Sequence, residues 1–135
     1  MSRIGCGAIT LLTLLLGACA QSPARDENLP LEQRLASLGY RQGEVVDALQ
    51  RFDIDGWQYL DKTHIILGDG PGRSYLVTFS RPCRNLNVSN GLGFSTTVGL
   101  LTRLDRIVSS DGSGFAEHCL IGELHRLEKV PKPGK

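Results

Sequence analysis

The sequence predicts a small α+β domain, in which an antiparallel β-sheet curls into a barrel-like structure and is preceded by a short N-terminal helical hairpin. Three observations lead to this prediction. Apolar residues recur at helical spacing between residues 30 and 52, they alternate with polar residues from residue 56 onward, and glycine-containing turns separate the alternating segments. A chain of 135 residues is long enough for one modest core, and therefore for a single domain.

The helical hairpin is predicted to span residues 30–52. Pro30 suits the first turn of a helix, and Gly39 ends the first apolar repeat. A second short helix is expected from about Gly43 to Arg51, because a new apolar set lies there. The apolar positions of the two helices are Leu31, Leu35, Leu38, Val45, Val46 and Leu49.

The β domain is predicted to span residues 56–128. Its clearest feature is a hairpin around Asp61-Lys62, because short apolar segments flank this turn on both sides. Every second side chain of a strand points to the same face, so Tyr75, Val77 and Phe79 are expected to share one face. The expected strands are residues 56–60, 64–67, 74–79, 94–101, 106–108 and 115–124.

The N-terminus has the features of an export signal. Residues 4–16 are apolar or small, and they are too few to cross a bilayer as a helix but match the apolar part of a secretory signal. The segment Leu16-Gly17-Ala18-Cys19 resembles the lipobox of bacterial lipoproteins, which implies cleavage between Ala18 and Cys19 and lipidation of Cys19. The alternative is an ordinary secretory signal that happens to contain a cysteine. The predicted divisions are a signal peptide at 1–18, a lipidated polar tether at 19–29, a globular domain at 30–129 and a tail at 130–135.

The residue after Cys19 and the overall charge suggest where the domain acts. Ala20 occupies the position at which a signal for retention in the inner membrane would usually have Asp, so the analogy favours the periplasmic face of the outer membrane. Loss of Arg3 with the signal peptide would reduce 15 basic residues to 14, equal to the 14 acidic residues. A protein with balanced charge has no long-range electric field that attracts phosphates, so nucleic acid is not the expected partner. The expected contact with a membrane is made through the lipid anchor on Cys19.

The four cysteines divide into two groups. Cys6 lies in the predicted signal peptide and Cys19 at the processing site, which leaves Cys83 and Cys119 in the domain. An exported domain meets an oxidising compartment, so we predict a disulfide between these two residues. A metal site that also uses histidines is the alternative. It is disfavoured because the adjacent residues His118 and Cys119 point to opposite faces of a strand.

No convergent set of catalytic residues is apparent in the sequence. His64 and His118 are candidates for a base at neutral pH, but no serine lies in a nucleophile-elbow motif. The residues that could assist one of these histidines are Asp61, Asp69, Asp105 and Ser74. We therefore assign no catalytic residue, no metal ligand and no cofactor.

A few residues are candidates for a ligand or partner surface. Five aromatic residues could line a ligand groove or a protein interface, or could pack in the core; they are Trp57, Tyr59, Tyr75, Phe79 and Phe94. His64 could contact a ligand or bond to the backbone. Arg81 and Arg84 bracket Pro82-Cys83 and could bind an acidic group, or could be solvated loop residues.

A series of short motifs occurs in a fixed order between Trp57 and about Leu127. They are Trp57, Asp61, His64-Ile65-Ile66-Leu67, Gly72-Arg73, Tyr75-Leu76-Val77-Thr78, Pro82-Cys83-Arg84-Asn85-Leu86, Gly93-Phe94, Asp105-Arg106-Ile107 and Cys119-Leu120-Ile121. This region resembles a family of small bacterial envelope proteins that is defined only as a domain of unknown function. The resemblance implies an exported or lipoprotein context and paired cysteines, and it implies no activity.

The sequence thus predicts a non-catalytic, lipid-anchored domain of the cell envelope. We expect this domain to bind another envelope component, either a protein or a small ligand. A membrane anchor removes the need to diffuse, which suits an accessory role. The alternative is a periplasmic hydrolase or a metal-dependent enzyme built around His64 or His118.

Overall fold

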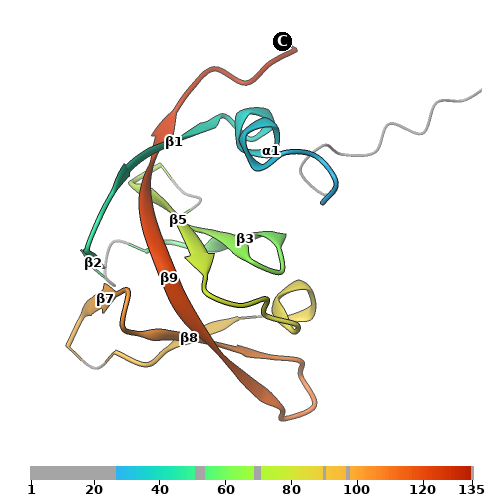
Figure 1. Ribbon diagram of the computed structural model, residues 1–135, viewed down its shortest axis with the longest axis vertical. Coiled ribbons are helices and arrows are strands. Elements are labelled where there is room, and N and C mark those ends of the chain that lie inside the picture. Colours follow the sequence, from blue (N-terminus) through green and yellow to red (C-terminus); the bar gives the residue numbers. More distant parts are fainter. Residues whose placement is uncertain (1–26, 51–53, 69–70, 90, 97, 135) are drawn as a thin grey trace, which may run out of the picture.

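The computed structural model describes residues 27–50, 54–68, 71–89, 91–96 and 98–134 (Figure 1). The predicted signal peptide and the processing site at Ala18 and Cys19 lie outside the described residues, and the proposed division of the chain stays a prediction. The elements are α1 (Leu31–Ser37), β1 (Tyr40–Val45), β2 (Ala48–Gln50), β3 (Trp57–Asp61), β4 (His64–Leu67), β5 (Ser74–Phe79), the 3-10 helix η3 (Leu86–Val88), β6 (Leu92–Phe94), β7 (Leu100–Thr102), β8 (Arg106–Ser110) and β9 (Ala116–Lys129).

The fold is α+β and consists mainly of antiparallel sheet, as the sequence predicts. The main sheet has seven strands in the order β3-β4-β5-β9-β8-β6, and β1 also pairs with β9. Strands β2 and β7 form a separate two-stranded sheet. Figure 1 shows β9 as a long curved strand that runs from the end of the molecule near α1 to the opposite end, where it joins β8. The sheet curls around this strand into a half-barrel.

A β-bulge lies in β9 at Gly122. Thr78 of β5 pairs with Glu123 and Phe79 pairs with Ile121, so Gly122 is the extra residue between the two pairs. Such an extra residue bends a strand and increases its twist. A Cβ atom at position 122 would lie 3.2 Å from both the carbonyl oxygen of Thr78 and the amide nitrogen of Ser80. Because both atoms belong to the backbone of the neighbouring segment, a side chain at position 122 would require that segment to move by a few tenths of an ångström.

The two faces of the sheet bury two separate cores. Leu76 and Val77 are adjacent in β5 and therefore point to opposite faces of the sheet. Both are fully buried, so both faces are covered. The first core contains Leu49, Ile65, Leu67, Tyr75, Val77, Phe79, Cys83, Leu86, Leu101, Ile107, Cys119, Ile121 and Leu124. The second core lies under α1 and contains Leu35, Tyr40, Leu60, Ile66, Leu76 and Leu127. The expected common face of Tyr75, Val77 and Phe79 is therefore confirmed.

The prediction of a second helix in the N-terminal hairpin is wrong, whereas the first predicted helix is confirmed as α1. The segment after α1 forms β1 and β2, and β1 pairs with the last part of β9. A Cβ at Gly43 of β1 would lie 2.8 Å from the carbonyl oxygen of Arg126, which shows how closely the two strands approach. A helix this short has little stability of its own, so the long-range hydrogen bonds to β9 decide the conformation.

The other expected strands differ from the structure mainly in their ends. The β3–β4 hairpin and β5 are confirmed, with Tyr59 opposite Ile65 and Ile65 opposite Val77. The expected strand 94–101 is divided into β6 and β7, and Gly99 before β7 has a positive φ of 82°. The last strand extends to Lys129 instead of ending at Leu124, because β1 supplies hydrogen-bonding partners there.

A disulfide joins Cys83 and Cys119, as the sequence predicts. Their Cα atoms lie 5.8 Å apart, and both residues are buried in the first core. The bond connects the loop after β5 to the first half of β9, across 36 positions of the chain. The amide of Cys83 also donates to the carbonyl oxygen of Lys62 at 2.7 Å, so the covalent bond and this hydrogen bond together hold the loop on the sheet.

We expect Gly122→Ala to reduce the free energy of unfolding by about 1–3 kcal/mol, because the added methyl group would crowd the backbone of β5. Unfolding in urea measures this change. Gly72→Ala is the matched control, since a Cβ there has no atom within 4 Å. Equal stability of the two variants would contradict the role assigned to the bulge.

Reduction of the disulfide is expected to reduce the free energy of unfolding by about 3–4 kcal/mol, as the chain-entropy model gives for a loop of this length. The measurement is urea unfolding with and without a reductant. The double variant Cys83→Ser, Cys119→Ser is the control and should not respond to the reductant. If the reductant also leaves the free energy of unfolding of the wild-type protein unchanged, the disulfide does not stabilise the fold.

Candidate functional site

The first candidate site is a buried polar group formed by Arg34, Asp61 and His64, here called the Asp61 cluster. Asp61 is the last residue of β3 and is 8% exposed. Its carboxylate accepts hydrogen bonds from Arg34 Nη2 at 2.6 Å, from His64 Nδ1 at 2.9 Å and from the backbone amide of Thr63 at 2.7 Å. The tight β3–β4 hairpin therefore places Asp61 and His64 beside each other.

Arg34 connects this hairpin to α1. It also donates from Nη1 to the carbonyl oxygen of Leu60 at 3.0 Å and from Nε to that of Leu29 at 3.1 Å. The side chain is only 5% exposed. A buried guanidinium is tolerated when its donors are satisfied and a carboxylate balances its charge, and both conditions are met here. The ion pair thus locks α1 onto the sheet.

Asp61 remains ionised because its partners outweigh its burial. Burial alone would raise the pKa of a carboxyl group. The hydrogen bonds from His64, Arg34 and the amide of Thr63 act in the opposite direction, and together they hold the pKa of Asp61 well below its usual range. The carboxylate is therefore ionised at neutral pH and remains so below the pH at which a free aspartate is protonated.

The Asp61–His64 pair resembles the base and orienting group of a hydrolase, but no nucleophile among the described residues completes it. In the described part of the chain, no hydroxyl or thiol forms a hydrogen bond with His64. The Ser74 hydroxyl instead donates to the carbonyl oxygen of Gly68, and Asp105 accepts from Thr102 at 2.8 Å. Asp69 lies outside the described residues. Of the possible catalytic partners, the structure thus brings Asp61 to His64 but brings neither Ser74 nor Asp105 there.

The aromatic candidates lie in or against the first core. Trp57, Tyr59 and Phe94 are half-buried and pack against it, and Tyr75 and Phe79 belong to it. The Tyr59 hydroxyl donates to Glu27 Oε1 at 2.7 Å. The burial of Tyr59 is the main cause that raises its pKa well above the usual value, and the hydrogen bond to Glu27 raises the pKa further. The packing role that the sequence offers for these residues therefore accounts for their positions.

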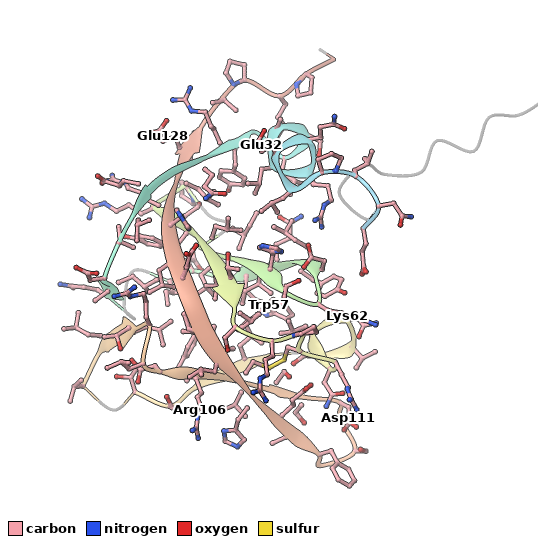
Figure 2. The ribbon with its side chains drawn as sticks, viewed as in Figure 1. Glu32, Trp57, Lys62, Arg106, Asp111 and Glu128 are labelled. Carbon is pink, nitrogen blue, oxygen red and sulfur yellow. A yellow bond between two sulfur atoms is a disulfide. The ribbon has the colours of Figure 1, made fainter. Side chains whose placement is uncertain are left out.

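The second candidate site is a groove of about 790 Å³ that we call the basic groove. Its walls include Ser80, Arg81, Arg106, Glu117, His118 and Leu120. In the β8–β9 ladder, Arg106 pairs with Leu120 and Val108 pairs with His118. These side chains face away from the first core, because the alternate residues Ile107 and Cys119 are buried in it. Figure 2 shows Arg106 projecting outward at this end of the molecule.

Positive charge dominates the basic groove. Arg81 and Arg106 are exposed, and neither forms an ion pair with another described residue. The one carboxylate of the groove, Glu117, accepts hydrogen bonds from the backbone amides of Arg84 at 2.8 Å and Asn85 at 2.9 Å. Arg84 is exposed and follows Arg81 by three residues, but it is not part of the groove lining. The arrangement can hold an anion.

Sequence reasoning missed two features of these sites. Arg34 was not recognised as a partner of Asp61, although it lies three residues after Leu31 and so falls on the apolar face of α1. Arg106 and His118 were not connected, because their proximity depends on the register of β8 on β9. A charged residue within an apolar helical stripe was the available signal for Arg34.

One group of three possible metal ligands occurs in the described ranges, namely Cys83, Glu117 and Cys119. Its two sulfur atoms are joined in the disulfide, and Glu117 is engaged by backbone amides. Thiolates are the form in which cysteine binds metals, so this group offers no metal site while the disulfide is intact.

Comparison with known proteins places the chain in a family. The sequence profile of DUF6491, a family of unknown function, matches residues 2–131. The chain belongs to this family. The match is consistent with the resemblance noted in the sequence and extends over the N-terminal segment as well. Searches of curated proteins and of solved structures gave no significant match. Within the described residues, no helix is both long and apolar enough to cross a membrane.

We expect Asp61→Asn to reduce the free energy of unfolding by about 3 kcal/mol at pH 7, because it leaves the buried charge of Arg34 unbalanced. Asp47→Asn is the matched control. Its side chain is 94% exposed and lies 3.9 Å from Arg103, so little change is expected. Similar losses in the two variants, measured by urea unfolding, would contradict this role of Asp61.

The same variant changes the dependence of stability on pH. Because folding lowers the pKa of Asp61, its contribution is fully present above about pH 4 and is lost as the pH falls below that value. The wild-type protein should therefore lose stability more steeply than Asp61→Asn between about pH 4 and pH 2. Parallel curves for the two proteins would show that the carboxylate is not stabilised by folding.

Proposed function

We propose that this protein is a lipid-anchored, non-catalytic binding protein of the cell envelope, held by lipid on Cys19 at the periplasmic face of the outer membrane. The observation that carries this proposal is the lipobox-like segment ending at Cys19, directly after an apolar stretch of signal-peptide length. A stable anchor requires more than one acyl chain, which lipoprotein processing supplies.

The disulfide supports an extracytoplasmic location. Disulfides persist in oxidising compartments and are rare in the cytosol. Cys83 and Cys119 are joined and buried in the first core, so the oxidised form is part of the folded domain. A domain that depends on this bond is suited to the envelope.

The use of the polar residues favours binding over catalysis. The Asp61–His64 pair is engaged by Arg34 in fastening α1 to the sheet, and this structural role explains its geometry. The basic groove, by contrast, has two arginines that are not needed for any ion pair of the described fold. Unused charge in a concave surface suits recognition of a ligand or partner.

Lipidation tests the anchor. Cells that express the protein with labelled palmitate should incorporate the label, and Cys19→Ser should abolish both the label and membrane association of the domain. Cys6→Ser is the matched control, because this second N-terminal cysteine lies in the predicted signal peptide and should leave both unchanged. Membrane association that survives Cys19→Ser, with no palmitate in the wild-type protein, would refute the proposal.

A further inference from the structure

We propose that the basic groove binds a phosphate group. This inference rests on the proposed function in that it names the chemistry of the ligand. It starts from three positively charged or protonatable side chains, those of Arg81, Arg106 and His118, which line one concavity with the hydroxyl-bearing Ser80.

The backbone holds these residues in fixed relative positions although they come from three segments. The amide of Ser80 donates to the carbonyl oxygen of Leu120 at 3.0 Å, and Arg106 pairs with Leu120 in the β8–β9 ladder. Leu120 thus lies between the segment that carries Arg81 and the strand that carries Arg106. His118 is two residues earlier in β9 and points to the same side.

The disulfide restrains the remaining wall. Cys83 lies two residues after Arg81, and Cys119 is next to His118. The loop after β5 is held a second time where its amides at Arg84 and Asn85 donate to Glu117. Both sides of the groove are therefore fixed before a ligand arrives, which reduces the entropy lost on binding.

The charges of the groove are available to a ligand. Arg34 pairs with Asp61 and Arg41 pairs with Glu128. Arg81 and Arg106 form no ion pair with a described residue, and the one carboxylate of the groove accepts hydrogen bonds from backbone amides. Arg126 has no ion pair in the described part of the chain either, so the proposal rests on the convergence of Arg81 and Arg106 in one concavity as well as on their lack of ion pairs. With a neutral imidazole the lining carries two positive charges and one negative charge, in a chain whose formal net charge is only +1.

The donor set suits a tetrahedral oxyanion such as phosphate better than a carboxylate. Two guanidinium groups and an imidazole come from three different segments, and a tetrahedral anion offers oxygens in several directions, so it can accept from all of them. A carboxylate has only two oxygens, both in one plane, and therefore matches donors from three segments less well. Nucleic acid is disfavoured, because it requires a longer basic surface than two arginines. Leu120, which is 45% exposed, provides an apolar contact for the organic part of a phosphate ester.

Titration of the full, lipidated protein in detergent with inorganic phosphate tests the site, with NMR used to follow the arginine and histidine side chains. Resonances of Arg81, Arg106 and His118 should shift together and saturate. Arg81→Gln and Arg106→Gln should each weaken binding at least about tenfold, as expected for the loss of a charge-assisted contact. Arg126→Gln is the matched control, because Arg126 is an exposed arginine of β9 that lies outside the groove and has no ion pair with a described residue.

A second titration distinguishes the source of the phosphate. Glycerol 3-phosphate represents a soluble ester, and phosphatidylglycerol incorporated into the detergent micelles represents a lipid headgroup. Tighter binding of the lipid that is lost in Arg106→Gln would identify a headgroup site, since Leu120 would contact the acyl chains. Tighter binding of glycerol 3-phosphate would identify a soluble phosphate ester. Either result supports the groove.

The proposal fails if phosphate leaves these resonances unchanged, or if Arg126→Gln weakens binding as much as the groove variants do. Thermal unfolding of each variant shows whether the fold is intact, and because both groove arginines are exposed, it should be. Failure of the groove leaves the lipid anchor untouched, because palmitate labelling at Cys19 does not depend on the ligand. Loss of the anchor alone would likewise leave phosphate binding measurable.

Discussion

The whole structure depends on the antiparallel pairing of β9 with three other strands. This strand has 14 residues, and it contacts β8 near its start, β5 in its middle and β1 near its end. No straight strand could serve all three partners in a half-barrel, and the bulge at Gly122 provides the bend. Both cores and the basic groove include residues on or next to β9, whereas the Asp61 cluster lies where α1 meets the β3–β4 hairpin.

The face of the sheet that is turned away from the first core differs between its two ends. The end beneath α1 is closed by the second core and by the ion pair between Arg34 and Asp61, so its polar residues serve the fold. The other end, on the β8–β9 ladder, is not covered by a described helix, and Arg106 remains exposed there. One end of β9 is therefore tied to the packing of α1, and the other end carries exposed charge.

Local pattern was sufficient where an element depends on its own residues. The β3–β4 hairpin was predictable because its turn and its apolar flanks are adjacent in sequence. The Cys83–Cys119 bond was predictable because the other two cysteines, Cys6 and Cys19, fall within the predicted signal peptide and at its predicted processing site. The segment around Gly43 was predicted as a helix because its apolar spacing is ambiguous, and only the distant partner β9 makes it a strand. The basic groove was not predictable for the same reason, since residues from three separate segments form it and the register of two strand pairs brings them together.

The placement of the disulfide has a consequence for how the molecule matures. Cys83 lies two residues after Arg81 and Cys119 lies next to His118, so the bond joins the two segments that form the walls of the basic groove. A newly made chain with free thiols has the same sequence but lacks the covalent tie between those walls. Oxidation is therefore a finishing step for the shape of the groove as well as for the core.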